Sequence, residues 1–318
     1  MYYIKISEIL KFVKMTLLIV FLTLTVSIVI IGSNEYFKVI NAPKYNPEIM
    51  QLNYEIMGSG EKTFVFIHGL TGSKNYWKKE LETISKTHQV LLVDLLGFGD
   101  SPKPNCNYSL NIQLEALERI INKESFNNGK VIIVGHSMGA IISMALLEKN
   151  PYWFKTGVFI STPVYKNADE FKKIMSKNSF VDRISTGKFS KYLCMIHPVF
   201  MSSVFKPDNL TNEVYEDAKK HNWQSYYYSL TEVVLKTDLN SLANTIKEKE
   251  VLFIHGKQDK IAPLKNALQL SKVFTKAKFI SSKEGDHQFF LKETNFVWQT
   301  IKNHSFSEKN QKLTFNEN

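Results

Sequence analysis

Short apolar runs alternate with amphipathic segments through the middle of the chain. An alternating segment follows residue 51, and apolar, mostly β-branched runs at 63–67, 90–93, 131–134, 158–160, 251–256 and 278–280 predict buried strands. Apolar positions at helical spacing predict helices over 109–124, 138–149, 263–273 and 289–302. Strands that alternate with helices indicate an α/β fold in which helices cover both faces of a mostly parallel sheet.

The strand pattern stops between residues 163 and 240 and then resumes. This segment is rich in aromatic residues and methionine, including Phe200, Met201, Phe205 and the run Tyr226–Tyr228, and it predicts a helical insertion. The length allows one large α/β domain with an insertion or two small domains, and we expect the first, over 51–302 with an insertion at about 163–240. Residues 303–318 are polar, which predicts a frayed C-terminal tail.

A long apolar run precedes this domain. Residues 15–31 read MTLLIVFLTLTVSIVII; Lys5, Lys11 and Lys14 precede the run, and Lys38 and Lys44 follow it, so the charge bias is modest. The length suits a bilayer core, and the bulky isoleucines at its end disfavour a signal-peptidase site. The pattern favours an uncleaved membrane anchor over 1–34, a linker over 35–50 and an extracytoplasmic domain. A cleaved signal peptide and a buried core helix are the alternatives.

Composition narrows the classes of partner. The chain has 318 residues and a net charge of +10, but its lysines are scattered and no nucleic-acid-binding module accompanies them. We expect no nucleic-acid partner. The two cysteines, Cys106 and Cys194, form no C-x-x-C motif, so no zinc or redox site is predicted, and their pairing stays open. We expect no metal and no organic cofactor.

The sequence GHSMG at 135–139 follows a predicted strand and opens a predicted helix. This is the context of a nucleophile elbow, in which a sharp turn exposes a serine and the flanking glycines avoid steric conflict. Amide N–H groups at the start of the helix can stabilise a developing anion. Ser137 is the candidate nucleophile; a plain strand-to-helix turn is the alternative.

A serine nucleophile needs a base and an orienting carboxylate, in the chain order Ser, acid, His. Asp259 in HGKQDKIAP follows a predicted strand, and His287 in EGDHQFF follows the last one. His287 is therefore the candidate base and Asp259 the candidate acid. Other aspartates are weaker alternatives: Asp94, Asp238, which resembles a helix cap, and Asp286, which adjoins His287. His68, His136 and His255 end strands and are expected to bond within their turns.

An oxyanion hole needs two backbone N–H groups. One is expected from Met138, directly after the nucleophile, and the other from Leu70 in the loop FIHGLTGS.

Five segments in order, HGLTGS, DLLGFGDSPKP, GHSMGA, HGKQDKIAP and GDHQFF, resemble the α/β-hydrolase superfamily over residues 51–302. The resemblance implies an eight-stranded, mostly parallel sheet, a Ser137–His287–Asp259 triad and a cap at about 163–240. Serine at the elbow disfavours the branches that use an aspartate nucleophile. Ala140 departs from the further glycine of many relatives, a change that a helix start tolerates.

The expected activity is hydrolysis of a carboxylic ester through an acyl-enzyme, as in esterases and lipases. The membrane anchor beside an aromatic-rich cap leads to the hypothesis that the ester is lipid-derived. A carbon–carbon bond hydrolase of the same fold, or a non-catalytic binding protein on this scaffold, are the alternatives.

Overall fold

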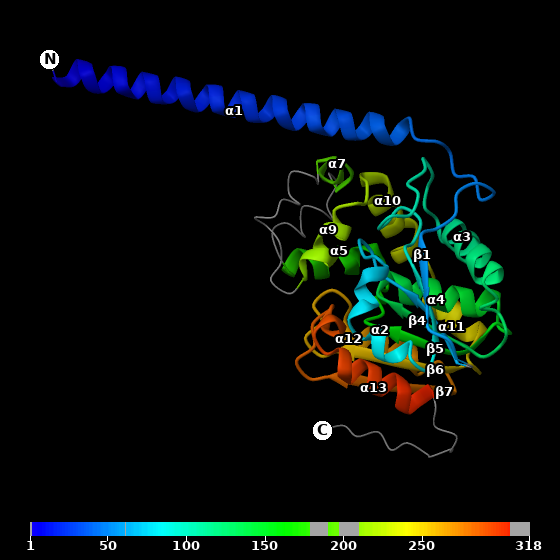
Figure 1. Cartoon of the computed structure of the whole chain (residues 1–318). Coiled ribbons are helices and arrows are strands. Elements are labelled where there is room, and N and C mark those ends of the chain that lie inside the picture. Colours follow the sequence, from blue (N-terminus) through cyan, green and yellow to red (C-terminus); the bar gives the residue numbers. More distant parts are fainter. Residues whose placement is uncertain (1, 61, 179–189, 197–209, 306–318) are drawn as a thin grey trace.

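The computed structural model describes residues 2–60, 62–178, 190–196 and 210–305. A twisted sheet forms its centre, and a long N-terminal helix projects beside it (Figure 1). The strands lie in the order β1-β3-β2-β4-β5-β6-β7, and all pairs are parallel except β1 with β3. The strand bounds are β1 Tyr54–Met57, β2 Thr63–Ile67, β3 Gln89–Val93, β4 Val131–His136, β5 Phe154–Ile160, β6 Glu250–Gly256 and β7 Lys276–Ser282.

The expected α/β fold is confirmed, but the expected eighth strand is wrong, because the described sheet has seven strands. The eighth strand came from the family resemblance and had no apolar run of its own in the sequence. The chain enters the sheet directly through β1, and the proline-containing segment before it contributes only an isolated bridge from Lys44 to Asn105.

Alternate residues of the buried strands face two separate apolar layers. Val65 and Ile67 of β2 pack into one layer, whereas Phe64 and Phe66 pack into the other. The first layer contains α3 (Leu110–Lys123), α4 (Met138–Lys149), α11 (Leu239–Thr245) and α12 (Leu264–Ser271). The second contains η1 (Lys74–Trp77), α2 (Lys78–Ile84) and α13 (Thr294–Ser305). A sheet covered on both faces explains why its central strands carry almost no polar residues.

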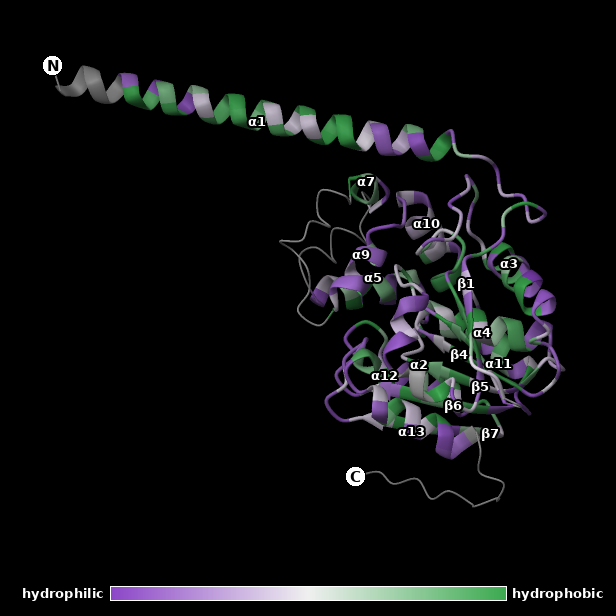
Figure 2. Ribbon diagram, viewed as in Figure 1, coloured by the Kyte–Doolittle hydropathy of each residue, from purple (hydrophilic) through white to green (hydrophobic). Residues whose placement is uncertain are grey.

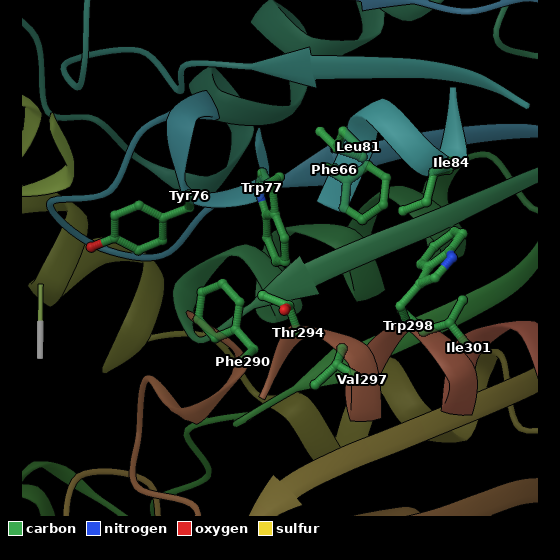
Figure 3. A pocket seen from close by; sticks show the side chains of 10 residues that line it. All are labelled: Phe66, Tyr76, Trp77, Leu81, Ile84, Phe290, Thr294, Val297, Trp298 and Ile301. Atoms are coloured by element: carbon green, nitrogen blue, oxygen red, sulfur yellow. The ribbon is translucent and has the colours of Figure 1, made fainter. Parts of the chain in front are cut away.

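A small cavity of about 40 Å³ lies within the second layer, between α2 and α13 (Figure 3). Trp77, Phe290 and Trp298 point into it from different elements, and its lining is almost wholly apolar. It contains no catalytic group. Apolar voids of this size occur inside well-packed proteins, so we interpret this cavity as part of the core.

The described chain between β5 and β6 is helical. Its elements are α5 (Ala168–Asn178), α7 (Ser190–Met195), α9 (Asn212–Ala218), α10 (Trp223–Tyr228), the π-helical turn η3 (Ser229–Val234) and α11. In Figure 1, α5, α7, α9 and α10 lie together beyond one end of the sheet, whereas α11 lies beside α4. Phe200, Met201 and Phe205, singled out in the sequence, lie outside the described residues.

The N-terminal helix α1 (Tyr2–Ile40) continues through the segment expected to begin a linker at residue 35. Its section Glu8–Ile40 is long and apolar enough to cross a membrane. Figure 2 shows apolar residues around the middle of this helix, where it stands clear of the domain. The closing helix α13 extends to Ser305, and residues 306–318 lie outside the description.

Candidate active site

Ser137 sits at the tight turn between the central strand β4 and helix α4. Its backbone has φ 53° and ψ −120°, a conformation that is strained for a residue with a side chain. A Cβ atom on Gly135 would lie 2.2 Å from the carbonyl oxygen of Gly139, and one on Gly139 would lie 2.3 Å from that of Ile67. Glycine is therefore required at both positions, and the turn presents the serine hydroxyl at the carboxyl edge of the sheet.

The three residues expected to form a triad are joined by two hydrogen bonds, both of them through His287. Ser137 Oγ is 3.0 Å from Nε2 of His287, and Nδ1 of His287 is 2.8 Å from Oδ2 of Asp259. The carboxylate can only accept, so Nδ1–H donates to it and Nε2 is left to accept the serine proton. This is the geometry in which a histidine can act as a base toward a serine.

Asp259 has no solvent-exposed side-chain surface, yet its carboxylate is well satisfied. The backbone N–H groups of Ile261 and Ala262 donate to Oδ1 at 2.9 and 2.8 Å, while Oδ2 faces His287. Burial alone would favour the neutral acid, but the charge interaction and hydrogen bond with His287 hold the pKa of Asp259 below its usual value. The carboxylate thus stays ionised and fixes the orientation of the imidazole.

The other aspartates serve elsewhere in the structure. Asp94 accepts hydrogen bonds from Asn53 Nδ2 and from the N–H groups of Lys74 and Asp100. Asp238 caps α11, as its sequence context suggested. Asp286 accepts from the N–H of Gln288. Of these four aspartates, Asp259 is the one whose carboxylate accepts a hydrogen bond from His287.

Of the histidines that end strands, His136 departs most from expectation. Its Nε2–H donates to the backbone carbonyl of His287 at 2.9 Å, a partner 151 positions away rather than in its own turn. Burial, reinforced by the neighbouring His287, lowers the pKa of His136 to about 3, so the ring is neutral. This side chain joins the serine turn to the histidine loop. Nothing in the sequence around GHSMG indicates that long-range contact.

His68 and His255 also bond beyond a simple turn. His68 accepts the Leu95 N–H at Nε2 while its Nδ1–H donates to the Gly69 carbonyl, and His255 donates to the carbonyl of Ala262. Burial lowers the pKa of both. They hold the loops that follow β2 and β6.

The expected oxyanion donors lie on the two segments that meet at Ser137. Met138 is the first residue of α4, where a helical N–H has no partner within the helix. Leu70 follows Gly69, whose Cβ position would lie 3.0 Å from Cβ of Ser137. Within the described chain, neither Leu70 nor Met138 donates its N–H to a backbone carbonyl.

Apolar side chains of the helical segment between β5 and β6 form a cluster beside the loop that contains Leu70. Phe171 and Met175 of α5 and Leu230 of η3 form a buried cluster, and Leu70 and Tyr226 pack against it. Leu70 thus lies in the loop beside Ser137 and also packs against the helical segment. The two cysteines lie apart from this site and are not joined by a disulfide.

A family model described as the alpha/beta hydrolase fold matches residues 62–294, and the chain belongs to this family. The fold is similar to that of an esterase (EaEST) from Exiguobacterium antarcticum, with a TM-score of 0.64 and 19% identity over 80% of this chain and 96% of the other. A bromoperoxidase from Bacillus anthracis gives a TM-score of 0.64 and 18% identity over 79% and 94%. At such identities these likenesses show the fold.

Among curated proteins, the chain is similar to "Probable lysophospholipase BODYGUARD 1" of Arabidopsis thaliana. The two are 23% identical over 75% of this chain and 59% of the relative. A shorter match, 28% identical over 30% of this chain and 34% of the other, joins it to "2-hydroxy-6-oxo-6-(2'-aminophenyl)hexa-2,4-dienoic acid hydrolase" of Metapseudomonas resinovorans. The chain thus spans well under two thirds of the length of these relatives.

Proposed function

We propose that the protein is a membrane-anchored serine hydrolase that cleaves carboxylic esters of lipid origin through an acyl-enzyme. The observation that carries this proposal is the pair of hydrogen bonds that links Ser137 to His287 at 3.0 Å and His287 to Asp259 at 2.8 Å. Family membership supports hydrolysis in general; the triad roles are our assignment.

In the proposed reaction, Nε2 of His287 takes the hydroxyl proton of Ser137 while Oγ attacks the ester carbonyl carbon. The N–H groups of Leu70 and Met138 donate to the oxyanion, and Asp259 stabilises the imidazolium. The imidazolium then returns its proton to the leaving alkoxide, which departs as the alcohol. Water, deprotonated by His287, cleaves the acyl-enzyme and releases the acid and free Ser137.

Two observations support a lipid-derived acyl group. The cluster of Phe171, Met175 and Leu230 beside Leu70 offers an apolar wall next to the proposed oxyanion site. A relative carries the name lysophospholipase. We further propose that residues 15–31 span a bilayer, that residues 1–34 form the anchor with the domain outside the cytoplasm, and that the helices at about 163–240 form a cap.

A fluorophosphonate probe tests the nucleophile on the full chain in detergent micelles. Labelling of the wild type should disappear in Ser137→Ala and fall sharply in His287→Ala. Ser161→Ala is the matched control, because Ser161 directly follows the neighbouring strand β5 and also has positive φ, at 48°. Labelling that survives Ser137→Ala, or no labelling of a folded wild type, contradicts the proposal and favours a non-catalytic scaffold.

A substrate panel then tests the acyl class. Lysophospholipids and monoacylglycerols should be cleaved faster than short soluble esters. Equal activity on short esters with none on acylglycerols would remove the lipid assignment. Turnover of a ring-cleavage diketo acid instead would identify the carbon–carbon hydrolase.

A further inference from the structure

The last turns of α1 are packed onto the domain rather than hanging from it. Tyr36 stacks on Trp223 of α10, with ring centroids 6.2 Å apart. Val39 is buried in one cluster with Cys194 and Met195 of α7 and with Trp223. The helix expected to enter the membrane is therefore continuous with a part that is fixed to α7 and α10.

An apolar groove of about 750 Å³ runs between α1 and α7. From α1 it is lined by Ile28, Val29, Gly32, Ser33, Tyr36 and Phe37, and from the other side by residues 191–193, 195 and 196. The approach is close, because a Cβ on Gly32 would lie 3.2 Å from Cγ2 of Ile196. Tyr192 on α7 remains 64% exposed, an unusual fraction for a large aromatic ring.

A second hollow, here called the lysine hollow, adjoins the next turn of α1. Its lining includes Lys38 of α1 together with Lys103, Lys219 and Lys220, which come from two other segments of the chain. Glu35 also lines it, Lys220 pairs with Asp100 and Asp217, and Lys219 pairs with Glu216, so these carboxylates balance most of its positive charge. A polar hollow of mixed charge suits the hydrated headgroup layer of a membrane rather than its hydrocarbon core.

Along α1, the residues that line the apolar groove end with the aromatic rings of Tyr36 and Phe37, and Lys38 of the lysine hollow follows. Ile28 and Lys38 are about 15 Å apart along a helix axis, at 1.5 Å per residue. That is enough to pass from the edge of a bilayer's hydrocarbon core across its headgroup layer. Tyrosine and lysine at this level match the usual composition of a membrane interface.

We propose that the last third of α1 and helix α7 form one membrane-contacting surface, with phospholipid acyl chains in the groove and the lysine hollow at the level of the headgroups. The inference rests on the proposed membrane anchor and deepens it. Tyr226 packs against both the α1–α7 cluster and the cluster beside Leu70. The bilayer contact is thus connected by packed side chains to the candidate active site, which suits a substrate that arrives from the membrane.

An environment-sensitive fluorophore on α7 tests this surface. Cys106→Ser and Cys194→Ala first remove the native thiols from the full chain, and Tyr192→Cys supplies the attachment point. Tyr152→Cys is the matched control, because Tyr152 is 88% exposed and lies beyond the opposite end of α4 from Ser137. Both variants are labelled with a nitrobenzoxadiazole dye and placed in phosphatidylcholine–phosphatidylglycerol vesicles.

The dye at position 192 should show blue-shifted emission and lose intensity when lipids carry a nitroxide near the headgroup, whereas the dye at 152 should show neither change. If the folded protein resists carbonate extraction but both dyes show equal, water-like emission, this inference is overturned and the proposed anchor stands. Extraction by carbonate overturns the proposed anchor and this inference with it. Fluorophosphonate labelling reports separately on the hydrolase assignment.

A crosslinking measurement on the wild type needs no substitution. Phospholipids with a diazirine on the acyl chain should label a peptide that contains residues 190–196 as well as peptides of α1. Crosslinks confined to α1 in the inserted protein contradict the inference.

Discussion

Replacing His136 with glutamine should flatten the dependence of stability on pH. The His136 side chain is 2% exposed, and burial together with His287 lowers its pKa from 6.5 to about 3. Between these values the unfolded chain binds a proton that the folded protein does not, so the folded state loses stability as the pH falls. Above pH 6.5 the full contribution is present. Glutamine does not titrate, but its amide N–H can still donate to the His287 carbonyl.

The size of the effect follows from the two pKa values. At pH 5 an unfolded-state pKa of 6.5 and a folded-state pKa of about 3 give a loss of about 2 kcal/mol relative to pH 7, at about 1.4 kcal/mol per pKa unit. Every other titrating group is common to both proteins. The difference between wild type and His136→Gln should therefore change by about 2 kcal/mol from pH 7 to pH 5.

Urea unfolding of the full chain in mild detergent, followed by tryptophan fluorescence, measures this difference. Parallel stability curves for the two proteins between pH 7 and pH 5 would refute the reasoning, because they would mean that folded His136 takes up its proton normally. A change of opposite sign would mean that it is held protonated.

Three further substitutions test the site and its supports. Asp259→Asn should lower kcat by roughly 10²–10⁴-fold with little change in KM, because the imidazole loses its orienting charge. The measurement uses the best ester of the panel, and an unchanged kcat would exclude Asp259 as the acid. Gly139→Ala should lower the midpoint of thermal unfolding or prevent folding, because its Cβ would lie 2.3 Å from the Ile67 carbonyl oxygen; a normal melt would contradict this contact. Asp217→Ala should destabilise the protein by about 1–3 kcal/mol in urea, because the Ser73 hydroxyl donates to Asp217 at 2.6 Å and would lose its acceptor; an unchanged midpoint would show that water replaces the carboxylate.

The buried strands and the serine turn were predictable because local physical constraints determine them. The run at 63–67 matches β2 as observed, and helix α3 begins and ends within one residue of its predicted bounds, since apolar spacing reflects burial directly. The need for glycine at 135 and 139 was also predictable, because both positions lie so close to backbone atoms that a Cβ is excluded. The order of Ser137, Asp259 and His287 then made the candidate site predictable.

Contacts between distant segments were not predictable from the same patterns. The helical segment between β5 and β6 gave no periodicity that indicates which side chains meet Leu70. The apolar run at 15–31 predicted an anchor but gave no sign that the following turns pack on Trp223. These pairings depend on how the elements are arranged in space, which a single sequence does not encode in its local spacing.

Strand order alone does not bring His287 to Ser137 either, because β7 is the third strand along the sheet from β4. The loop after β7 must turn back toward the centre, and hydrogen bonds show how it is held there. The N–H groups of Lys257 and Gln258 donate to the carbonyls of Ser282 and Gly285, both at 2.8 Å. His136 then holds the carbonyl of His287 from the serine side. The base is thus positioned from both neighbouring loops, so the 3.0 Å distance between Ser137 and His287 depends on backbone contacts that lie outside the three candidate catalytic residues themselves.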